Sequence, residues 1–181
     1  MSDHTLQARY DVIGLLAIVE TDQFQKKYPT PSQSATNPTP LASSDCLMVC
    51  NSSRVISGQG SNDLSLRANA GDLLNIYNTA SCLSDTAAIA YAVTEKEGRP
   101  IFMSPQLYTL PIQSAVMPGT SSRNGLPAAT ARINFSEIDA KVRQSGTTNL
   151  EISFAVYTLD DRGEAQQLFG YFSGTYRITI S

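Results

Sequence analysis

The chain has 181 residues, of which 41% are hydrophobic and only 16% are charged. The charged fraction lies below the ~25% of an average globular domain, and Ser, Thr, Asn and Gln take its place, as is common in all-β proteins with many turns. Thirteen basic and sixteen acidic residues give a net charge of −3 without any basic block, so nucleic acid is not an expected partner. The length fits a single domain over residues 1–181.

Residues 1–8 carry no basic segment ahead of an apolar stretch, so they do not form a secretory signal and we expect them to be frayed. The longest apolar run, Val12 to Val19, is too short to cross a bilayer, which needs about 20 residues. These features predict a cytoplasmic protein without membrane insertion.

Three cysteines occur, an odd number without the spacing of a disulfide framework. Cys46 and Cys50 could form a metal pair only if the segment turned, because residues four apart in a strand lie about 13 Å from each other. We therefore expect Cys46, Cys50 and Cys82 to be free thiols in a reducing compartment.

The first half of the chain alternates short apolar segments with turns. Residues 9–20 predict a buried strand, and residues 21–28 predict a short helix capped by Thr21 or Asp22. Residues 29–45 contain four prolines and many Ser and Thr residues, which predicts an extended loop that crosses one end of the fold. Further predicted strands cover residues 45–51, 64–68, 73–77 and 87–94.

The second half continues with strands over residues 101–103, 107–116 and 131–135. Residues 136–142 predict a second helical turn, because Ser136 is a good cap and Ile138 and Val142 are four residues apart. Asn124-Gly125 is a strong turn dipeptide between two of these strands.

The stretch from Asn149 to Ser181 carries the clearest pattern. Leu150, Ile152, Phe154, Val156 and Thr158 alternate with smaller or polar residues, as a half-buried strand requires. Asp160 to Gly163 supplies a turn, and an aromatic-rich return strand follows. With eight to ten short strands in all, the sequence predicts an antiparallel β-sandwich or jelly-roll with one or two short helices.

Catalytic constellations are not predicted. The single histidine, His4, lies in the frayed terminus, which excludes Ser-His-Asp and Cys-His arrangements and most zinc sites. Asp160 and Asp161 are adjacent, so they do not form the facing pair of a glycosidase. We expect a protein that is not an enzyme and needs no cofactor.

Ligand binding by loops at one end of the sandwich is the chemical alternative. Carboxylate and amide oxygens of the loops could hold a hard cation such as Ca²⁺ and, through it, the hydroxyl groups of a carbohydrate. The same side chains also form turns and caps in many proteins. The candidate ligand-binding residues are Gln59, Asn62, Asp63, Asp72, Asn78 and Asp85.

Four stretches resemble the bacterial PixA/AidA family of inclusion-body proteins. They are QFQKKYPTP over residues 23–31, which is followed by Asn37-Pro38-Thr39, SGQGSNDLSLRANAGD over 57–72, NGLPA over 124–128 and FAVYTLDDRGEAQQLFGY over 154–171. Family members usually continue from the last stretch with a Trp-Asp-Pro-like run, whereas this chain has FSGT over residues 172–175 and no tryptophan.

The resemblance implies a cytoplasmic bacterial protein that in some relatives forms intracellular inclusions and in others is produced under quorum-sensing control. It brings no catalytic residues. Together with the edge strands that a sandwich leaves uncovered, it predicts a non-enzymatic homo-oligomer with a host-interaction or storage role.

Overall fold

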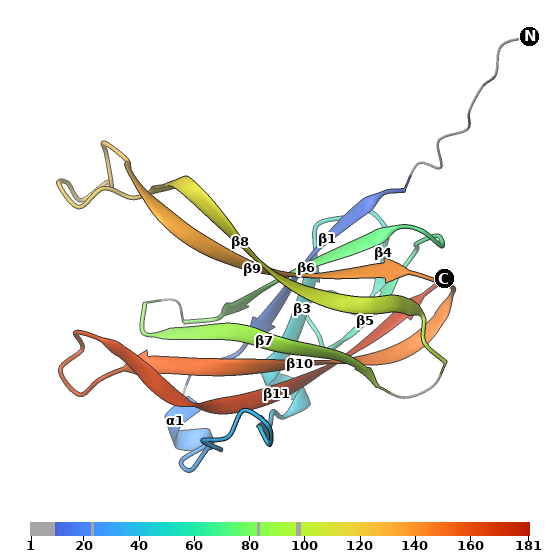
Figure 1. Ribbon diagram of the computed structural model, residues 1–181, viewed down its shortest axis with the longest axis horizontal. Helices are drawn as coiled ribbons and strands as arrows, with labels where there is room; N and C mark the ends of the chain where they lie inside the picture. Colours follow the sequence, from blue (N-terminus) through green and yellow to red (C-terminus); the bar gives the residue numbers. More distant parts are fainter. Residues whose placement is uncertain (1–9, 23, 83, 97–98) are drawn as a thin grey trace, which may run out of the picture.

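The protein is a sandwich of two β-sheets in a computed structural model that describes residues 10–22, 24–82, 84–96 and 99–181 (Figure 1). One sheet has the strand order β3-β1-β6-β9-β8, and the other has the order β4-β5-β11-β10-β7, with β2 also pairing to β11. This confirms the all-β prediction. The strands are β1 (Val12–Val19), β2 (Thr39–Pro40), β3 (Cys46–Cys50), β4 (Val55–Ser57), β5 (Asp63–Leu66), β6 (Leu73–Ala80), β7 (Thr86–Lys96), β8 (Phe102–Met117), β9 (Ala129–Val142), β10 (Gly146–Leu159) and β11 (Gln166–Ile180).

The core lies between the inner faces of the two sheets. Leu150, Ile152 and Phe154 of β10 are fully buried, and so is Phe172 of β11, which pairs with Phe154. The period-two alternation predicted for this stretch is confirmed, because each of these residues points to the same face of its sheet. Burying one such side chain stabilises the fold by about 1.5–3 kcal/mol.

Most neighbouring strands are antiparallel, as predicted, but both sheets are mixed. Strand β1 runs parallel to β6 along its full length, and β11 runs parallel to β5 and to the two residues of β2. The long hairpins β8–β9 and β10–β11 are antiparallel. Gly163 ends the turn of the second hairpin with a φ of +70°, as its position predicts.

One predicted helix forms and the other does not. The helix α1 (Phe24–Lys27) is confirmed, whereas the predicted helical turn over residues 136–142 is wrong and belongs to β9. Ile138 and Val142 are buried, but so is Ala140 between them, which fits a period of two. Pairing with β6 on one side and β8 on the other outweighs the local helical signal.

The last four strands are longer than predicted. Residues 101–103 and 107–116 join into the single strand β8, whose register against β9 shifts between Met103 and Gln106 and again between Ile112 and Ala115. The first of these shifts accommodates Ser104 and Pro105, which lie between the two predicted strands.

The hairpin β8–β9 extends beyond the sandwich. Strand β6 pairs with β9 only from Leu73 to Tyr77, where the partner residue is Glu137. Farther along, β9 pairs with β8 alone as far as Ala129, opposite Met117. We call residues 108–136 the arm; it projects from the body at the upper left of Figure 1.

The proline-rich segment runs beneath the second sheet, as predicted for an extended loop (Figure 1). The hydroxyl of Tyr28 donates to the Asp45 carboxylate at 2.6 Å and accepts from the amide of Ala42 at 2.9 Å, and Lys27 forms an ion pair with Asp45. Burial and the bond to Asp45 raise the pKa of Tyr28 to about 12. This network joins the start of the loop to its end.

The three cysteines are free, as predicted. Cys46 and Cys50 are buried in the core, and burial raises the pKa of Cys46 to about 11. At neutral pH this thiol is therefore protonated and packs as a small apolar side chain.

Replacing Phe154 with alanine should lower the free energy of unfolding by about 3–5 kcal/mol, because it leaves a cavity between the sheets. Urea denaturation monitored by circular dichroism measures this change. The matched control is Gln167→Ala on the exposed face of β11, which should change the free energy by less than about 0.5 kcal/mol. Equal effects of the two substitutions would contradict the packing described here.

Candidate functional site

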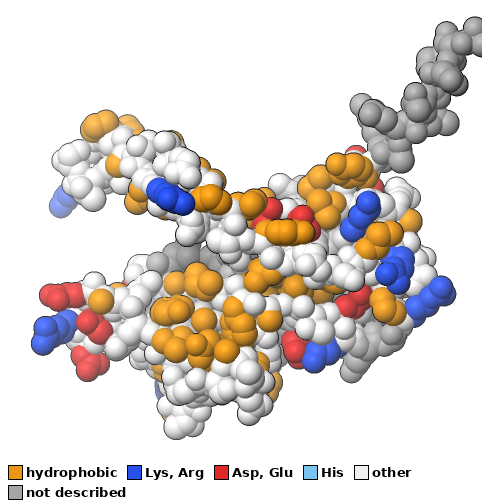
Figure 2. All heavy atoms as spheres, in the orientation of Figure 1, with side chains coloured by type: hydrophobic (Ala, Val, Ile, Leu, Met, Phe, Trp, Pro, Cys, Tyr) orange, Lys and Arg blue, Asp and Glu red, His pale blue; other side chains and the backbone are white. Residues whose placement is uncertain are grey.

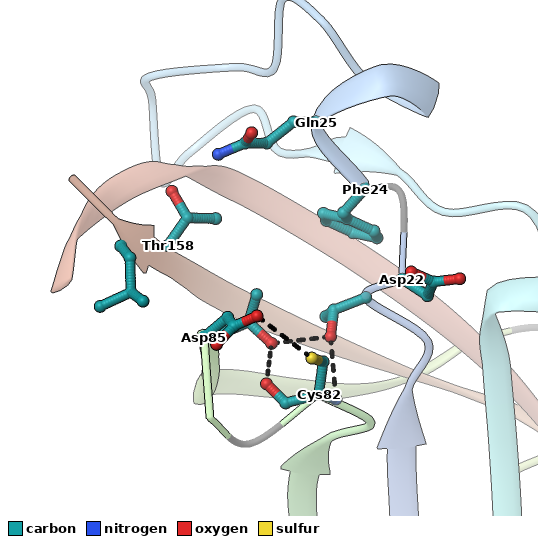
Figure 3. A pocket seen from close by; sticks show the side chains of 9 residues that line it. Asp22, Phe24, Gln25, Cys82, Asp85 and Thr158 are labelled. Atoms are coloured by element: carbon teal, nitrogen blue, oxygen red, sulfur yellow. Dashed lines mark hydrogen bonds between the residues drawn. The ribbon is translucent and has the colours of Figure 1, made fainter. Parts of the chain in front are cut away.

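A small pocket lies where α1, the β6–β7 turn and the end of β10 meet (Figure 3). Its volume is about 310 Å³. Thr21 and Thr86 join its walls through hydroxyl groups 2.7 Å apart, and Thr86 also donates to the carbonyl oxygen of Cys82 at 2.7 Å. The lining residues are Thr21, Asp22, Phe24, Gln25, Cys82, Asp85, Thr86, Thr158 and Leu159.

The chemistry of this pocket is that of a polar cavity and not of a reactive centre. The Cys82 thiol lies 3.8 Å from the Asp85 carboxylate, to which it donates. Among the described residues of the lining there is no Lys, Arg or His that would stabilise a thiolate or act as a base beside it. The pocket can therefore hold a small polar molecule, but it lacks the parts of a nucleophilic site.

A larger groove opens where β9 leaves β6. It has a volume of about 580 Å³ and lies between the end of β6, the base of the arm and strand β7. Figure 2 shows the hollow between the arm and the body. Its lining is mostly apolar or aromatic, with Leu16, Tyr77, Ile89 and Phe135 among the larger side chains.

Asn78 is one of the polar residues of the groove, with Thr79, Thr109, Asn134 and Ser136. Its Nδ2 donates to the carbonyl oxygen of Ala88 at 2.7 Å, which ties β6 to β7. Its Oδ1 is buried and accepts no hydrogen bond. Because this oxygen is buried, it is a gap in the internal hydrogen bonding of the fold and not an open acceptor at the surface of the groove.

The arm presents an apolar surface on the side turned away from the core. Directly paired residues share a face, and Leu107 pairs with the core residue Ile138, so the residues next to them point outward. We call the outward-facing set the outer strip. Its apolar members are Tyr108, Leu110, Ile112, Ile133 and Phe135, the last of which also reaches the edge of the groove.

The outer strip ends in two carboxylates at the base of the arm. Glu137 pairs with Tyr77 and Asp139 pairs with Asn75 of the neighbouring strand. The Asn75 amide donates to both carboxylates, at 3.2 Å and 2.9 Å, and neither forms an ion pair within the described part of the chain. Burial and the Glu137 carboxylate raise the pKa of Tyr77.

Three of the predicted ligand residues lie in one loop, where the fold uses them internally. Gln59 accepts from the amide of Cys50 at 3.0 Å and donates to the carbonyl oxygen of the same residue. The carbonyl oxygen of Asn62 accepts from the amide of Arg177 at 2.7 Å, and the Asp63 carboxylate lies 3.7 Å from its guanidinium group.

Asp72 is buried and holds the start of β6. Its carboxylate accepts from the amides of Asp11 and Asn69 and from the guanidinium of Arg54, each at 2.9 Å. Burial opposes its ionisation, but these hydrogen bonds outweigh burial and hold the pKa of Asp72 below its ordinary value.

The remaining two predicted residues line different cavities. Asn78 lines the groove, and Asp85 lines the small pocket. The structure therefore does not bring the six residues together at one end of the sandwich. Within the described residues no group of three or more His, Cys, Asp and Glu could hold a metal ion. Calcium binding by these loops stays a prediction, and His4 lies outside the described residues.

Two comparisons with known proteins agree with this architecture. The sequence profile of the PixA inclusion body proteins matches residues 11–180. This chain belongs to the PixA inclusion body protein family. A crystal structure of the inclusion body protein PixA from Burkholderia cenocepacia is similar, with a TM-score of 0.79 and 26% identity over 97% of this chain and 99% of that one. A search of the curated proteins finds no match.

Family membership confirms the resemblance carried by the four sequence stretches. In this PixA family member, part of the first stretch forms α1 and supplies Lys27 and Tyr28 to the network with Asp45. The last stretch forms most of the β10–β11 hairpin, in which Asp160 caps the turn by accepting from the amide of Glu164 at 2.9 Å. As predicted, Asp160 is a turn residue. No helix in the described part of the chain is long and apolar enough to cross a membrane.

Sequence reasoning missed the outer strip and the groove. Two signals were present, namely the alternation of Tyr108, Leu110 and Ile112 with polar residues and the absence of Asp and Glu from residues 99–136. Both signals were hidden by the incorrect helix over residues 136–142, which placed Glu137 on a separate element.

The substitution Asp72→Asn should lower the free energy of unfolding by about 2 kcal/mol at pH 7, because the charge-assisted bonds are lost. Folding lowers the pKa of this carboxyl group, so its stabilisation is complete above the unfolded value of about 3.9 and is lost as the pH falls through the folded value. The difference in free energy of unfolding between wild type and variant should therefore become smaller as the pH falls. Urea midpoints measured from pH 7 to pH 3 test this.

The control for this prediction is Asp161→Asn, which changes an exposed residue of the same type. Its urea midpoint should follow that of the wild type throughout. A constant gap between Asp72→Asn and the wild type over the whole pH range would contradict the proposed role of the charge.

Proposed function

We propose that this PixA family member is a non-enzymatic protein that self-associates through its arm. The observation that carries the proposal is the exposure of the outer strip. Tyr108, Leu110, Ile112 and Phe135 are 41–46% exposed. Tyr108 lies where the support of β6 ends, and the other three lie beyond it on a ribbon of β8 and β9 alone. A two-stranded ribbon is marginally stable alone, and a contiguous apolar surface of this kind is typical of an interaction site.

The mode of association follows from the strand chemistry. Strand β8 is an edge strand, and its Pro105 and Pro111 lack the N–H groups that a further strand would need. Addition of a strand to this edge is therefore disfavoured. Packing of the apolar face against another surface buries the same side chains without that cost.

The biological role of an assembly, in storage, host interaction or a quorum-sensing-linked process in the cytoplasm, is part of the proposal. A protein with an exposed apolar surface such as the outer strip is suited to assembly.

Static light scattering over a dilution series tests self-association. The expected result is a mass above 19.5 kDa that falls on dilution. The double substitution Leu110→Ser and Phe135→Ser should shift the midpoint to a concentration at least about tenfold higher, because buried aromatic and aliphatic anchors carry most interface energy.

The matched control for this test is Ile56→Ser. Ile56 is 50% exposed but lies on β4, away from the arm. Its dilution curve should follow that of the wild type. A wild type of 19.5 kDa at every concentration would refute the proposal.

A second candidate is the binding of a carbohydrate or another small ligand, which the volume of the groove and the polar side chains in its lining favour. Glycan-array screening with and without Ca²⁺ tests it. A hit that is lost in Asn78→Ala would support binding in the groove, whereas uniformly absent signals would remove this candidate.

A further inference from the structure

The charge and polarity of the side chains change along the outer strip and the arm tip in an order that makes this surface complementary to itself. Its acidic end is formed by Glu137 and Asp139, its centre is apolar, and the arm tip beyond it carries Arg123 in the β8–β9 loop. The stretch from residue 99 to residue 136 contains no Asp or Glu. Figure 2 shows red carboxylates beside orange side chains where the arm joins the body, and blue but no red on the arm itself.

We propose that two copies of this chain dock arm against arm about a two-fold axis, with the acidic end of each outer strip on the arm tip of the other. This inference rests on the proposed self-association and names its geometry. An isologous contact requires one patch that fits itself after a rotation of 180°. A strip that is acidic at one end and apolar in the middle, and that leads to an arm tip carrying Arg123, meets this requirement when the two copies run in opposite directions.

The register along the strip supports the position of the axis. The directly paired residues Ile112 and Ile133 lie at the centre. Ile133 is four residues from Glu137 and four residues from Ala129, where β9 begins. At about 3.3 Å per residue, both distances are about 13 Å. A rotation about the central pair therefore places the acidic end of one copy over the start of the tip loop of the other.

The charges at both ends are available for such a contact. Arg123 is exposed and forms no ion pair in the described structure. Glu137 and Asp139 are held in place by Asn75 but lack a cationic partner. Each dimer would contain two copies of the ionic contact, so a change at one position acts twice.

Charge reversal on one end and then on the other gives a sharp test. Arg123→Glu brings like charges together at both ends, and so does the double substitution Glu137→Lys with Asp139→Asn. Each variant alone should raise the dimer dissociation constant by about tenfold or more, because juxtaposed like charges suppress association. An equimolar mixture of the two variants should restore dimers, since every contact in the mixed pair is again between opposite charges.

The matched control is Arg132→Glu. Arg132 carries the same charge on the same arm but alternates with Ile133, so it points to the opposite face. Its dimer dissociation constant should stay within about twofold of the wild-type value. Both constants are measured over a range of salt concentrations, because salt screens exposed charges in general. Thermal melts by circular dichroism establish that each variant is folded.

Cross-linking gives a second readout that does not require a folded charge variant. In a Cys82→Ser background, Ile112→Cys lies beside the axis and should give covalent dimers with a short bis-maleimide. Asn134→Cys, which is exposed on the other face, should not.

The possible outcomes separate the two proposals. A wild type that is monomeric at all concentrations overturns both. Equal dissociation constants for the wild type and Arg123→Glu, together with no cross-linking of Ile112→Cys, overturn the two-fold arm contact. Self-association through another surface then stands. Loss in each variant, rescue in the mixture and cross-linking at position 112 support the inference.

Discussion

The pairing between β6 and β9 stops at Tyr77 and Glu137, and the shape of the molecule depends on this limit. From Glu137 onward, β9 is an interior strand that pairs on both sides and packs on the core through Ile138, Ala140 and Val142. Residues 129–136 of the same strand are half of a two-stranded ribbon. The arm, the groove at its base and the outer strip all follow from one strand that is longer than the neighbour that supports it.

Buried polar groups organise the loops at both ends of β1, Asp45 beside its last residue and Asp72 beside its first. Asp45 receives Lys27 and Tyr28, and Asp72 receives Arg54 and two amides. Each carboxylate is satisfied by several donors, as a buried charge requires. These two networks fix loops that would otherwise be free to move. The apolar side chains of the outer strip and the carboxylates of Glu137 and Asp139, which have no cationic partner in the described structure, lie outside these two networks.

The sequence predicted the core well because burial on one face of a strand leaves a period of two that is easy to recognise. Leu150, Ile152 and Phe154 were predicted and found in the core, and the turn at Asp160 to Gly163 joins the expected hairpin. Residues 136–142 were misread because Ile138 and Val142 satisfy a helical spacing as well as an extended one. Only tertiary pairing decides between the two.

The candidate ligand residues show a different limit. Asn and Asp in loops were predicted from their chemistry alone, and chemistry does not tell whether an oxygen is already occupied. Gln59 and Asp72 bond to the backbone of their own fold, whereas Asn78 keeps one oxygen without a donor. That distinction depends on which segments meet in space, and a single sequence does not contain it.

The two prolines of β8 have a consequence for behaviour at high concentration. An exposed apolar ribbon in a crowded solution normally risks conversion to cross-β fibrils, which grow by adding strands to a continuous row of N–H donors. Pro105 and Pro111 interrupt that row. On the edge formed by β8, the ribbon is thereby directed to contacts between folded molecules and away from the addition of strands.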